Sequence, residues 1–131
     1  IDRGLVGSEM CIRDSLLPDT PATKGILDKS LFEKMPKGSF LLNAGRGNQL
    51  VEKDLTMALD NGQIKGAALD VFIEEPLPQN HPFWNDHRII ITPHHAAEVF
   101  MPSAANAFVE NIERVRSGQP LKGLVNQKVG Y

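Results

Sequence analysis

The sequence has little of several features that would assign it to a particular class of protein. Its 131 residues include one cysteine, Cys11, which is too little to argue a redox compartment. A formal net charge of -2 at pH 7 gives no basic excess, and we expect no nucleic-acid partner. No apolar run approaches the roughly 20 residues that a membrane-spanning helix needs, and none near the start resembles a secretory signal. We therefore expect a cytoplasmic protein without membrane association.

The composition is that of an ordinary globular domain. Hydrophobic residues make up 41% and charged residues 23% of the chain. A chain of this length can bury one hydrophobic core, whereas enzymes with two domains usually need more residues. We also expect no metal site.

The first residues do not match the rest of the chain. Residues 1–15, IDRGLVGSEMCIRDS, show no clean periodicity and run into LLPDTPAT without a turn or linker. The string LVGSEMCIRDS resembles the in-frame translation of a transposon-type sequencing-library adapter. We interpret residues 1–15 as such an artefact, expect them to be disordered, and take Leu16 as the approximate start of the authentic sequence. The alternative is a genuine disordered N-terminus.

From Leu16 onward, short apolar runs alternate with segments of helical period. This alternation favours βαβ units and a parallel sheet whose strands are covered on both faces. We expect strands at 39–43, 65–72 and 88–93, the remnant of a strand at the start of 16–25, and helices from Asp28 to Pro36, from Val51 to Asn61-Gly62, and from Met101 to Ser117. A Pro-rich loop separates the last two strands.

Polar residues with catalytic potential follow these strands. Arg46 follows SFLLN, Asp70 and Glu75 follow GAAL, and His94 follows IIITP. The carboxyl ends of parallel strands share one edge of a sheet, and ligands bind in the crevice outside that edge. We therefore expect these four side chains to converge.

The residue types suit the reduction of a carbonyl group. His94 can protonate the oxygen, and Glu75 can orient the imidazole and favour its charged form. The planar guanidinium of Arg46 can bind a substrate carboxylate with two hydrogen bonds. Each residue taken alone has a structural explanation: a surface ion pair for Arg46, a hydrogen-bonded structural group for His94 and a cap for Asp70.

Three segments resemble the signature sequences of the D-isomer-specific 2-hydroxyacid dehydrogenases, with the branch of A-type glyoxylate/hydroxypyruvate reductases closest. They are LLPDTPATKGIL, LLNAGRGNQLVEKDLTMALDNGQIKGAALDVFIEEP and IITPHHAA, and the resemblance runs from Leu16 to the end. It implies an α/β fold, namely the second half of a Rossmann-like doubly wound parallel sheet with a C-terminal helix. Residues 16–131 would then form a partial NAD(P)-binding domain whose substrate domain is missing.

The resemblance also implies functions for individual residues. Arg46 would bind the 2-oxoacid carboxylate, Glu75 would pair with His94, and His94 would donate the proton. Asp70 would lie against the nicotinamide carboxamide. The cofactor, NADP or NAD, would be contacted by a set of residues made up of Leu17, Pro18, Thr23, Ala44, Gly45, Arg46, Asp70, His94, Ala96 and Ala97. His95 has no counterpart in the motif, and we expect it to be a bystander.

The Gly-x-Gly-x-x-Gly turn of that family does not occur in the sequence, nor does the residue that selects NAD or NADP. We therefore expect this chain alone to be inactive, and the apolar residues Met101, Phe108 and Ile112 to be exposed.

The parent protein would be a homodimer that reduces a small 2-oxoacid. The alternatives are a dehydrogenase for another 2-ketoacid and a nucleotide-sensing module like the corepressors built on this scaffold. The tail LVNQKVGY favours the enzyme.

Overall fold

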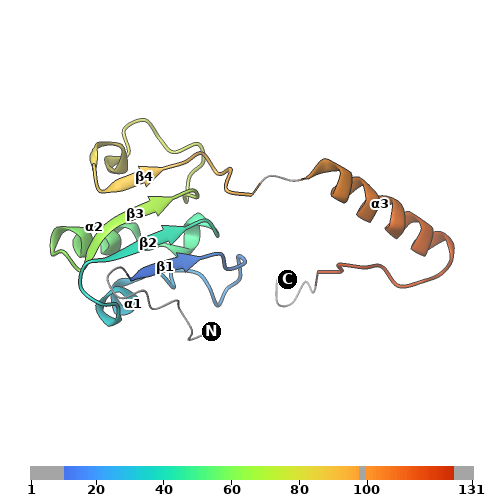
Figure 1. Ribbon diagram of the computed structural model, residues 1–131, viewed down its shortest axis with the longest axis horizontal. Helices are drawn as coiled ribbons and strands as arrows, with labels where there is room; N and C mark the ends of the chain where they lie inside the picture. Colours follow the sequence, from blue (N-terminus) through green and yellow to red (C-terminus); the bar gives the residue numbers. More distant parts are fainter. Residues whose placement is uncertain (1–10, 98–99, 126–131) are drawn as a thin grey trace. The chain divides into compact units, whose positions relative to one another are not determined.

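The computed structural model describes residues 11–97 and 100–125, in two compact units that divide between Ala96 and Ala97. The first unit contains a parallel sheet of order β1-β2-β3-β4 (Figure 1). Its strands are β1 (Ile12–Ser15), β2 (Ser39–Asn43), β3 (Ile64–Leu69) and β4 (Ile89–Ile91), and its helices are α1 (Lys29–Lys34), α2 (Glu52–Asp60) and the 3₁₀ turns η1 (Gly47–Gln49) and η2 (Pro82–Asn85). The expected α/β architecture is confirmed. Because the strands are parallel, their carboxyl ends lie at the same edge of the sheet.

The helix boundaries follow local sequence signals. Asp28 caps α1 as expected, because its carboxylate accepts a 2.9 Å hydrogen bond from the Leu31 backbone N–H. Helix α2 ends at its C-cap, Asn61, and Gly62 follows with a φ of +72°, a conformation that glycine adopts without strain. The predicted helices at these positions are therefore confirmed.

The core lies between the sheet and helices α1 and α2. Leu55 and Leu59 of α2, Phe32 of α1 and Leu41 and Ile64 of the sheet are all at most 4% exposed. Each such side chain removes apolar surface from water and stabilises the fold by about 1.5 to 3 kcal/mol relative to an exposed position. Helix packing on this face fixes the strands whose ends carry the polar residues.

The opposite face of the sheet differs from our expectation of strands covered on both faces. The strand register aligns Leu42 of β2, Ala68 of β3 and Ile90 of β4 in one row. Leu42 is 37% and Ile90 65% exposed. The apolar runs did predict buried strands, but among the described residues of the first unit no helix packs over this row.

Strand β1 is a second difference. Residues 12–15 were expected to be disordered, but they pair in parallel with β2 from Ile12–Phe40 to Ser15–Asn43. The expected strand remnant at 16–17 is instead loop. Three of the four β1 side chains are exposed, so backbone hydrogen bonding to the edge of β2, rather than an apolar pattern, holds this strand. Residues 1–10 lie outside the described residues, and an adapter origin stays a prediction.

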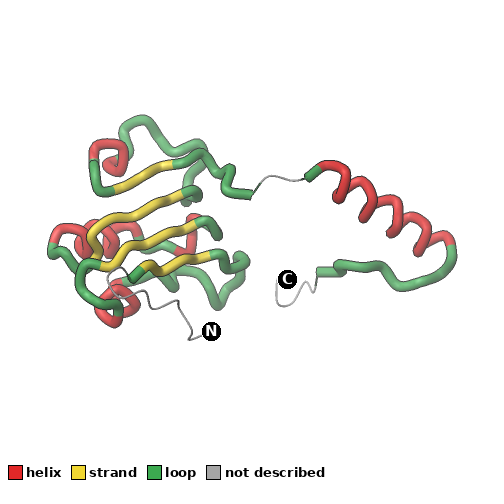
Figure 2. The backbone as a smooth tube through the Cα atoms, viewed as in Figure 1, coloured by secondary structure: helices red, strands yellow, loops and turns green. Residues whose placement is uncertain are grey.

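The second unit consists of α3 (Met101–Arg116) and the segment that follows it. The helix predicted at Met101 to Ser117 is confirmed, and Figure 2 shows it in red, followed by a green loop that covers residues 117–125. None of its residues is buried, and Met101 and Phe108 are 72% and 69% exposed, as expected. Within the described ranges, the structure contains no helix long and apolar enough to cross a bilayer. Most of the LVNQKVGY tail, residues 126–131, lies outside the described residues.

Candidate active site

The four polar residues singled out from the sequence all follow the carboxyl ends of β2, β3 and β4. Parallel pairing brings these ends together, because Asn43 is aligned with Leu69 and Leu69 with Ile91. The turns that leave the three strands therefore begin side by side. Any side chain in their first few residues can reach the same volume of space.

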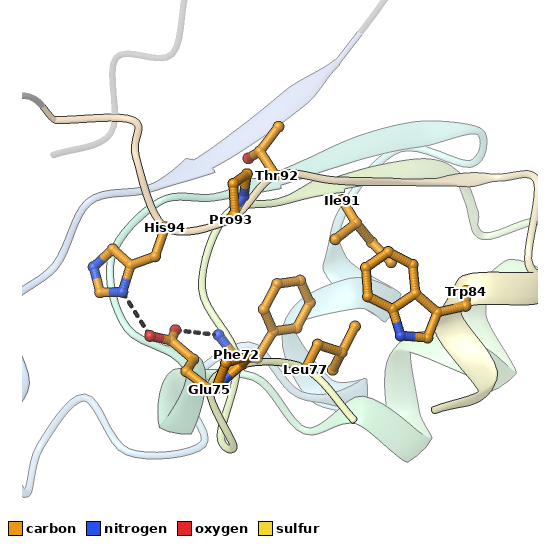
Figure 3. A pocket seen from close by; sticks show the side chains of 9 residues that line it. Phe72, Glu75, Leu77, Trp84, Ile91, Thr92, Pro93 and His94 are labelled. Atoms are coloured by element: carbon orange, nitrogen blue, oxygen red, sulfur yellow. Dashed lines mark hydrogen bonds and ion pairs between the residues drawn. The ribbon is translucent and has the colours of Figure 1, made fainter. Parts of the chain in front are cut away.

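His94 and Glu75 form the central pair. The Nδ1 atom of His94 lies 2.7 Å from Oε2 of Glu75, and the two side chains are 45% and 35% exposed. The other carboxylate oxygen, Oε1, accepts a 2.9 Å hydrogen bond from the backbone N–H of Phe72 (Figure 3). Both oxygens of Glu75 are thus engaged, which fixes the carboxylate and, through it, the imidazole ring.

The pKa of Glu75 is lowered from its ordinary value. The hydrogen bond from His94 is the largest cause, followed by the one from the Phe72 N–H, and the charges of His94 and Arg46 act in the same direction. Partial burial opposes them without reversing the shift. An ionised Glu75 accepts hydrogen bonds only, so Nδ1 of His94 carries the proton of this bond and Nε2 is the free ring nitrogen.

Asp70 is buried at 6% exposure and makes a different set of contacts from Glu75. Its Oδ1 accepts a 2.5 Å hydrogen bond from the Thr92 hydroxyl and a 3.1 Å bond from the His95 N–H. Its Oδ2 accepts a 2.9 Å bond from the Ala96 N–H. Burial raises the pKa of Asp70, but these hydrogen bonds and the charge of His95 outweigh it, and the net pKa is lowered.

Arg46 reaches the pair through its charge. Its side chain is exposed, and Nη1 donates a 2.7 Å hydrogen bond to the carbonyl oxygen of Gly45. One amine of the guanidinium is thus held against the backbone, while its positive charge lowers the pKa of Glu75. Arg46 therefore acts on Glu75 through its charge, and its role in the site stays a prediction.

An apolar pocket of about 600 Å³ opens beside the His94–Glu75 pair. Figure 3 shows the pair at one end and Phe72, Leu77 and Trp84 further along. Leu77 and Trp84 come from the Pro-rich loop, and Trp84 is held there by a 2.8 Å hydrogen bond from its indole N–H to the Pro78 carbonyl oxygen. The pocket therefore combines an apolar wall with a single polar end.

The loop at 17–23 is tied to the turn after β2. The amide nitrogen of Gln49 donates hydrogen bonds of 2.8 Å and 3.1 Å to the carbonyl oxygens of Leu17 and Pro18. The Thr23 hydroxyl donates a 2.7 Å bond to the same Pro18 oxygen. A Cβ at Gly45 would lie 3.0 Å from the Leu17 carbonyl oxygen, so only glycine fits this close approach. The backbone of Leu17 and Pro18 therefore packs directly against the turn that contains Gly45.

The remaining expected cofactor residues are less closely linked. Ala44 is connected to β1 by a 3.0 Å hydrogen bond from its N–H to the Ser15 carbonyl oxygen. Ala96 is tied to Asp70, as described above. Ala97 is exposed and belongs to the second unit. A cofactor contact for any of them stays a prediction.

Sequence reasoning missed Gln49 and Thr92. Gln49 is fully buried, and its carboxamide oxygen also accepts a 2.9 Å hydrogen bond from the Ser15 hydroxyl. In the sequence, Gln49 stands out only as a polar residue just before the periodic apolar positions of α2. Thr92 stands directly before Pro93 and His94, and its position in that motif was the signal available.

Comparisons with known proteins are consistent with this geometry. A family model described as the D-isomer specific 2-hydroxyacid dehydrogenase, NAD binding domain, matches residues 14–96. The chain is 50% identical to glyoxylate/hydroxypyruvate reductase A of Photorhabdus laumondii, over 97% of this chain and 40% of that protein. It is 47% identical to the reductase of the same name from Serratia proteamaculans, over 89% of this chain and 37% of the relative. The chain thus spans about 40% of the length of the first of these curated relatives.

Solved structures give the same result. An NADPH-dependent glyoxylate/hydroxypyruvate reductase from Sinorhizobium meliloti, in complex with NADP and sulfate, matches with a TM-score of 0.86 at 38% identity, over 92% of this chain and 40% of that one. A D-isomer specific 2-hydroxyacid dehydrogenase from Xanthobacter autotrophicus, in complex with NADPH and MES, matches with a TM-score of 0.87 at 38% identity, over 92% of this chain and 50% of that one. The parallel sheet with its helices is the Rossmann-like NAD-binding architecture of these enzymes. The chain belongs to the D-isomer specific 2-hydroxyacid dehydrogenase family.

Proposed function

We propose that the protein containing this chain reduces small 2-oxoacids, such as glyoxylate and hydroxypyruvate, to 2-hydroxyacids with NADPH or NADH. The observation that carries the proposal is the 2.7 Å contact between His94 and an ionised Glu75 at the carboxyl edge of the sheet. The names of the relatives support the substrate class, since they are glyoxylate/hydroxypyruvate reductases. The cytoplasmic location, the homodimer and the lack of a nucleic-acid partner stay predictions from the sequence.

His94 is the proton donor of this proposal. Its Nδ1–H is engaged by Glu75, so the proton for the substrate oxygen comes from Nε2. The carboxylate of Glu75 holds the imidazole ring in position while Nε2 transfers its proton. The substrate carbonyl carbon gains a hydride and its oxygen gains this proton, which together give the 2-hydroxyacid.

Arg46 is the proposed binding group for the substrate carboxylate. Nη1 is held by the Gly45 carbonyl oxygen, and the remaining donors of the planar guanidinium are directed by this anchor. Arg and carboxylate form paired, charge-assisted hydrogen bonds that a lysine cannot reproduce. A bound 2-oxoacid would then be oriented before it reacts.

The residues present fit the nicotinamide end of a dinucleotide. A reduced nicotinamide, when bound, supplies the hydride. Asp70 would hold the carboxamide, because Oδ1 already accepts two hydrogen bonds whereas Oδ2 accepts one and keeps a lone pair. Ala44, Gly45 and Ala96 are small enough for a flat ring to approach the backbone. Leu17, Pro18, Thr23 and Ala97 complete the set of proposed cofactor residues.

Two adjacent histidines provide a test with a matched control. In the full-length protein, His94→Ala should lower the kcat for glyoxylate by about 10² to 10⁴-fold, the usual effect of losing a general acid. His95→Ala should leave kcat nearly unchanged, because its backbone N–H contacts Asp70 in the mutant as well. Consumption of NADPH is followed by absorbance, and equal losses in the two variants would contradict the role of His94.

The same assay separates the enzyme from a nucleotide-sensing module. A reductase consumes NADPH when glyoxylate is added, whereas a sensor binds NADPH without turnover. Arg46→Ala should chiefly raise the KM for glyoxylate in the enzyme, since it removes a substrate-binding group. A wild-type protein that binds NADPH tightly but reduces no 2-oxoacid would favour the sensor.

A further inference from the structure

We propose that Thr92 is a positioning residue for His94, acting with the buried Asp70 as a clip that holds the turn carrying the proton donor. This inference rests on the proposed function and deepens it. The clip consists of the Asp70 carboxylate and its hydrogen-bond donors, the Thr92 hydroxyl and the backbone N–H groups of His95 and Ala96.

The clip closes on both sides of His94. Thr92 precedes the histidine by two positions, and its hydroxyl lies 2.5 Å from Oδ1 of Asp70. The N–H groups of His95 and Ala96 follow directly after His94 and lie 3.1 Å and 2.9 Å from the two oxygens of the same carboxylate. A single buried side chain therefore fastens the turn before and after its catalytic residue.

His94 needs such fastening because its backbone is unusual. Its φ is +53°, and among the described residues it is the only residue other than glycine with a positive φ. The Cβ of an L-residue crowds the backbone in this left-handed region, so the conformation persists only when surrounding contacts over-determine it. The clip supplies these contacts, and the 2.7 Å bond to Glu75 forms from the resulting ring position.

Thr92 is itself well placed as an anchor. Its backbone N–H donates a 3.0 Å hydrogen bond to the Leu69 carbonyl oxygen, which continues the pairing of β3 and β4 by one residue. Its hydroxyl then joins the strand end to Asp70, which directly follows Leu69 in the chain. The turn begins from a fixed point on the sheet, and Pro93 restricts the backbone between this point and His94.

Replacing Asp70 would not test the clip cleanly, because Asp70 is also a proposed cofactor residue. Thr92→Val removes the hydroxyl donor while keeping the branched shape of the side chain and the charge of Asp70. Thr92→Ser keeps the donor. Thr56→Val is the matched control, because the Thr56 hydroxyl donates to a backbone carbonyl on the exposed side of α2, away from the strand ends.

In the full-length protein, Thr92→Val should lower the kcat for glyoxylate by about 10 to 10²-fold, as expected when a reacting group is displaced by a fraction of an ångström to 1 Å. The dissociation constant for NADPH, measured by fluorescence titration, should change by no more than about twofold. Thr92→Ser should restore most of the kcat, and Thr56→Val should behave as the wild type. An unchanged kcat in Thr92→Val, a serine variant no better than valine, or a loss of NADPH affinity equal to the loss of kcat would overturn the proposal.

The backbone of His94 gives a second readout that does not depend on activity. In the 131-residue chain, the three-bond coupling between the amide and α protons and the carbon shifts of His94 report φ by NMR. The wild type and Thr92→Ser should show the left-handed value, and Thr92→Val should show averaging with negative φ. A left-handed value in all three would overturn the clip. If the wild-type protein reduced no 2-oxoacid, the proposed function would fail while this measurement still decided the role of Thr92.

Discussion

Replacing Gly47 with alanine should destabilise the first unit by at least about 3 kcal/mol, because the new methyl group has no room. A Cβ at this position would lie 1.9 Å from the carbonyl carbon of Phe72, 2.1 Å from its oxygen and 2.4 Å from the nitrogen of Ile73. Ordinary contacts of this kind begin near 3.4 Å. All three clashing atoms belong to the backbone, so no side-chain rotation relieves the overlap.

The size of this destabilisation depends on which atoms would have to move to make room for the methyl group. Overpacking typically costs about 1 to 3 kcal/mol when flexible side chains absorb it, and more when they cannot. The segment that the methyl group would displace starts at Val71, which is 1% exposed, and Phe72 is bonded through its N–H to the Glu75 carboxylate. We therefore place the cost at or above the upper end of this range. The same displacement would pull Glu75 away from His94.

The assay is urea unfolding at pH 7, followed by far-UV circular dichroism and by the fluorescence of Trp84, the only tryptophan. Gly38→Ala serves as the control, because Gly38 has a φ of +81° with nothing within 4 Å of a new Cβ. Backbone strain alone should cost the control about 1 to 2 kcal/mol. If Gly47→Ala were no more destabilising than Gly38→Ala, the tight contact between the two turns would be refuted.

Two further predictions concern stability away from the site. The hydrogen bonds from Arg88 lower the pKa of Asp86 from 3.8 to about 2. A carboxylate whose pKa is lowered in the folded state stabilises the fold at pH values above its ordinary pKa. Asp86→Asn should therefore lower the free energy of unfolding by about 1 to 2 kcal/mol at pH 7, and this cost should shrink as the pH falls from 4 toward 2. A cost that does not change with pH in urea titrations would contradict this. Leu55→Ala should cost about 2 to 5 kcal/mol because Leu55 is 0% exposed, whereas Met57→Ala on the same helix, at 47% exposure, should cost well under half as much.

The composition of the site was predictable because it follows from topology. Parallel strands bring their carboxyl ends to one edge, so Arg46, Glu75 and His94 could be grouped from their positions after apolar runs. The sequence pairs Glu75 with His94, and the 2.7 Å contact confirms this pairing.

Other features were not predictable because tertiary contacts create them. The left-handed φ of His94 has no signal in its residue type, since the turn that carries it is hydrogen-bonded to Asp70, far earlier in the chain. Strand β1 was missed because its residues do not alternate between apolar and polar, and an edge of β2 supplies the pairing whatever the side chains are. Apolar runs also cannot say whether a helix covers a given face, as the exposed Ile90 shows.

The one-sided surroundings of the His94–Glu75 pair bear on its response to ionic strength. Mobile ions screen charges in water over about 8 Å at physiological salt, but they screen partly buried pairs much less. Phe72, Leu77 and Trp84 line the pocket on one flank of the pair, so that flank is less favourable to counterions than open solvent. The contact between His94 and Glu75 should therefore weaken less with added salt than that of Lys29 and Glu33, whose side chains are each 63% exposed.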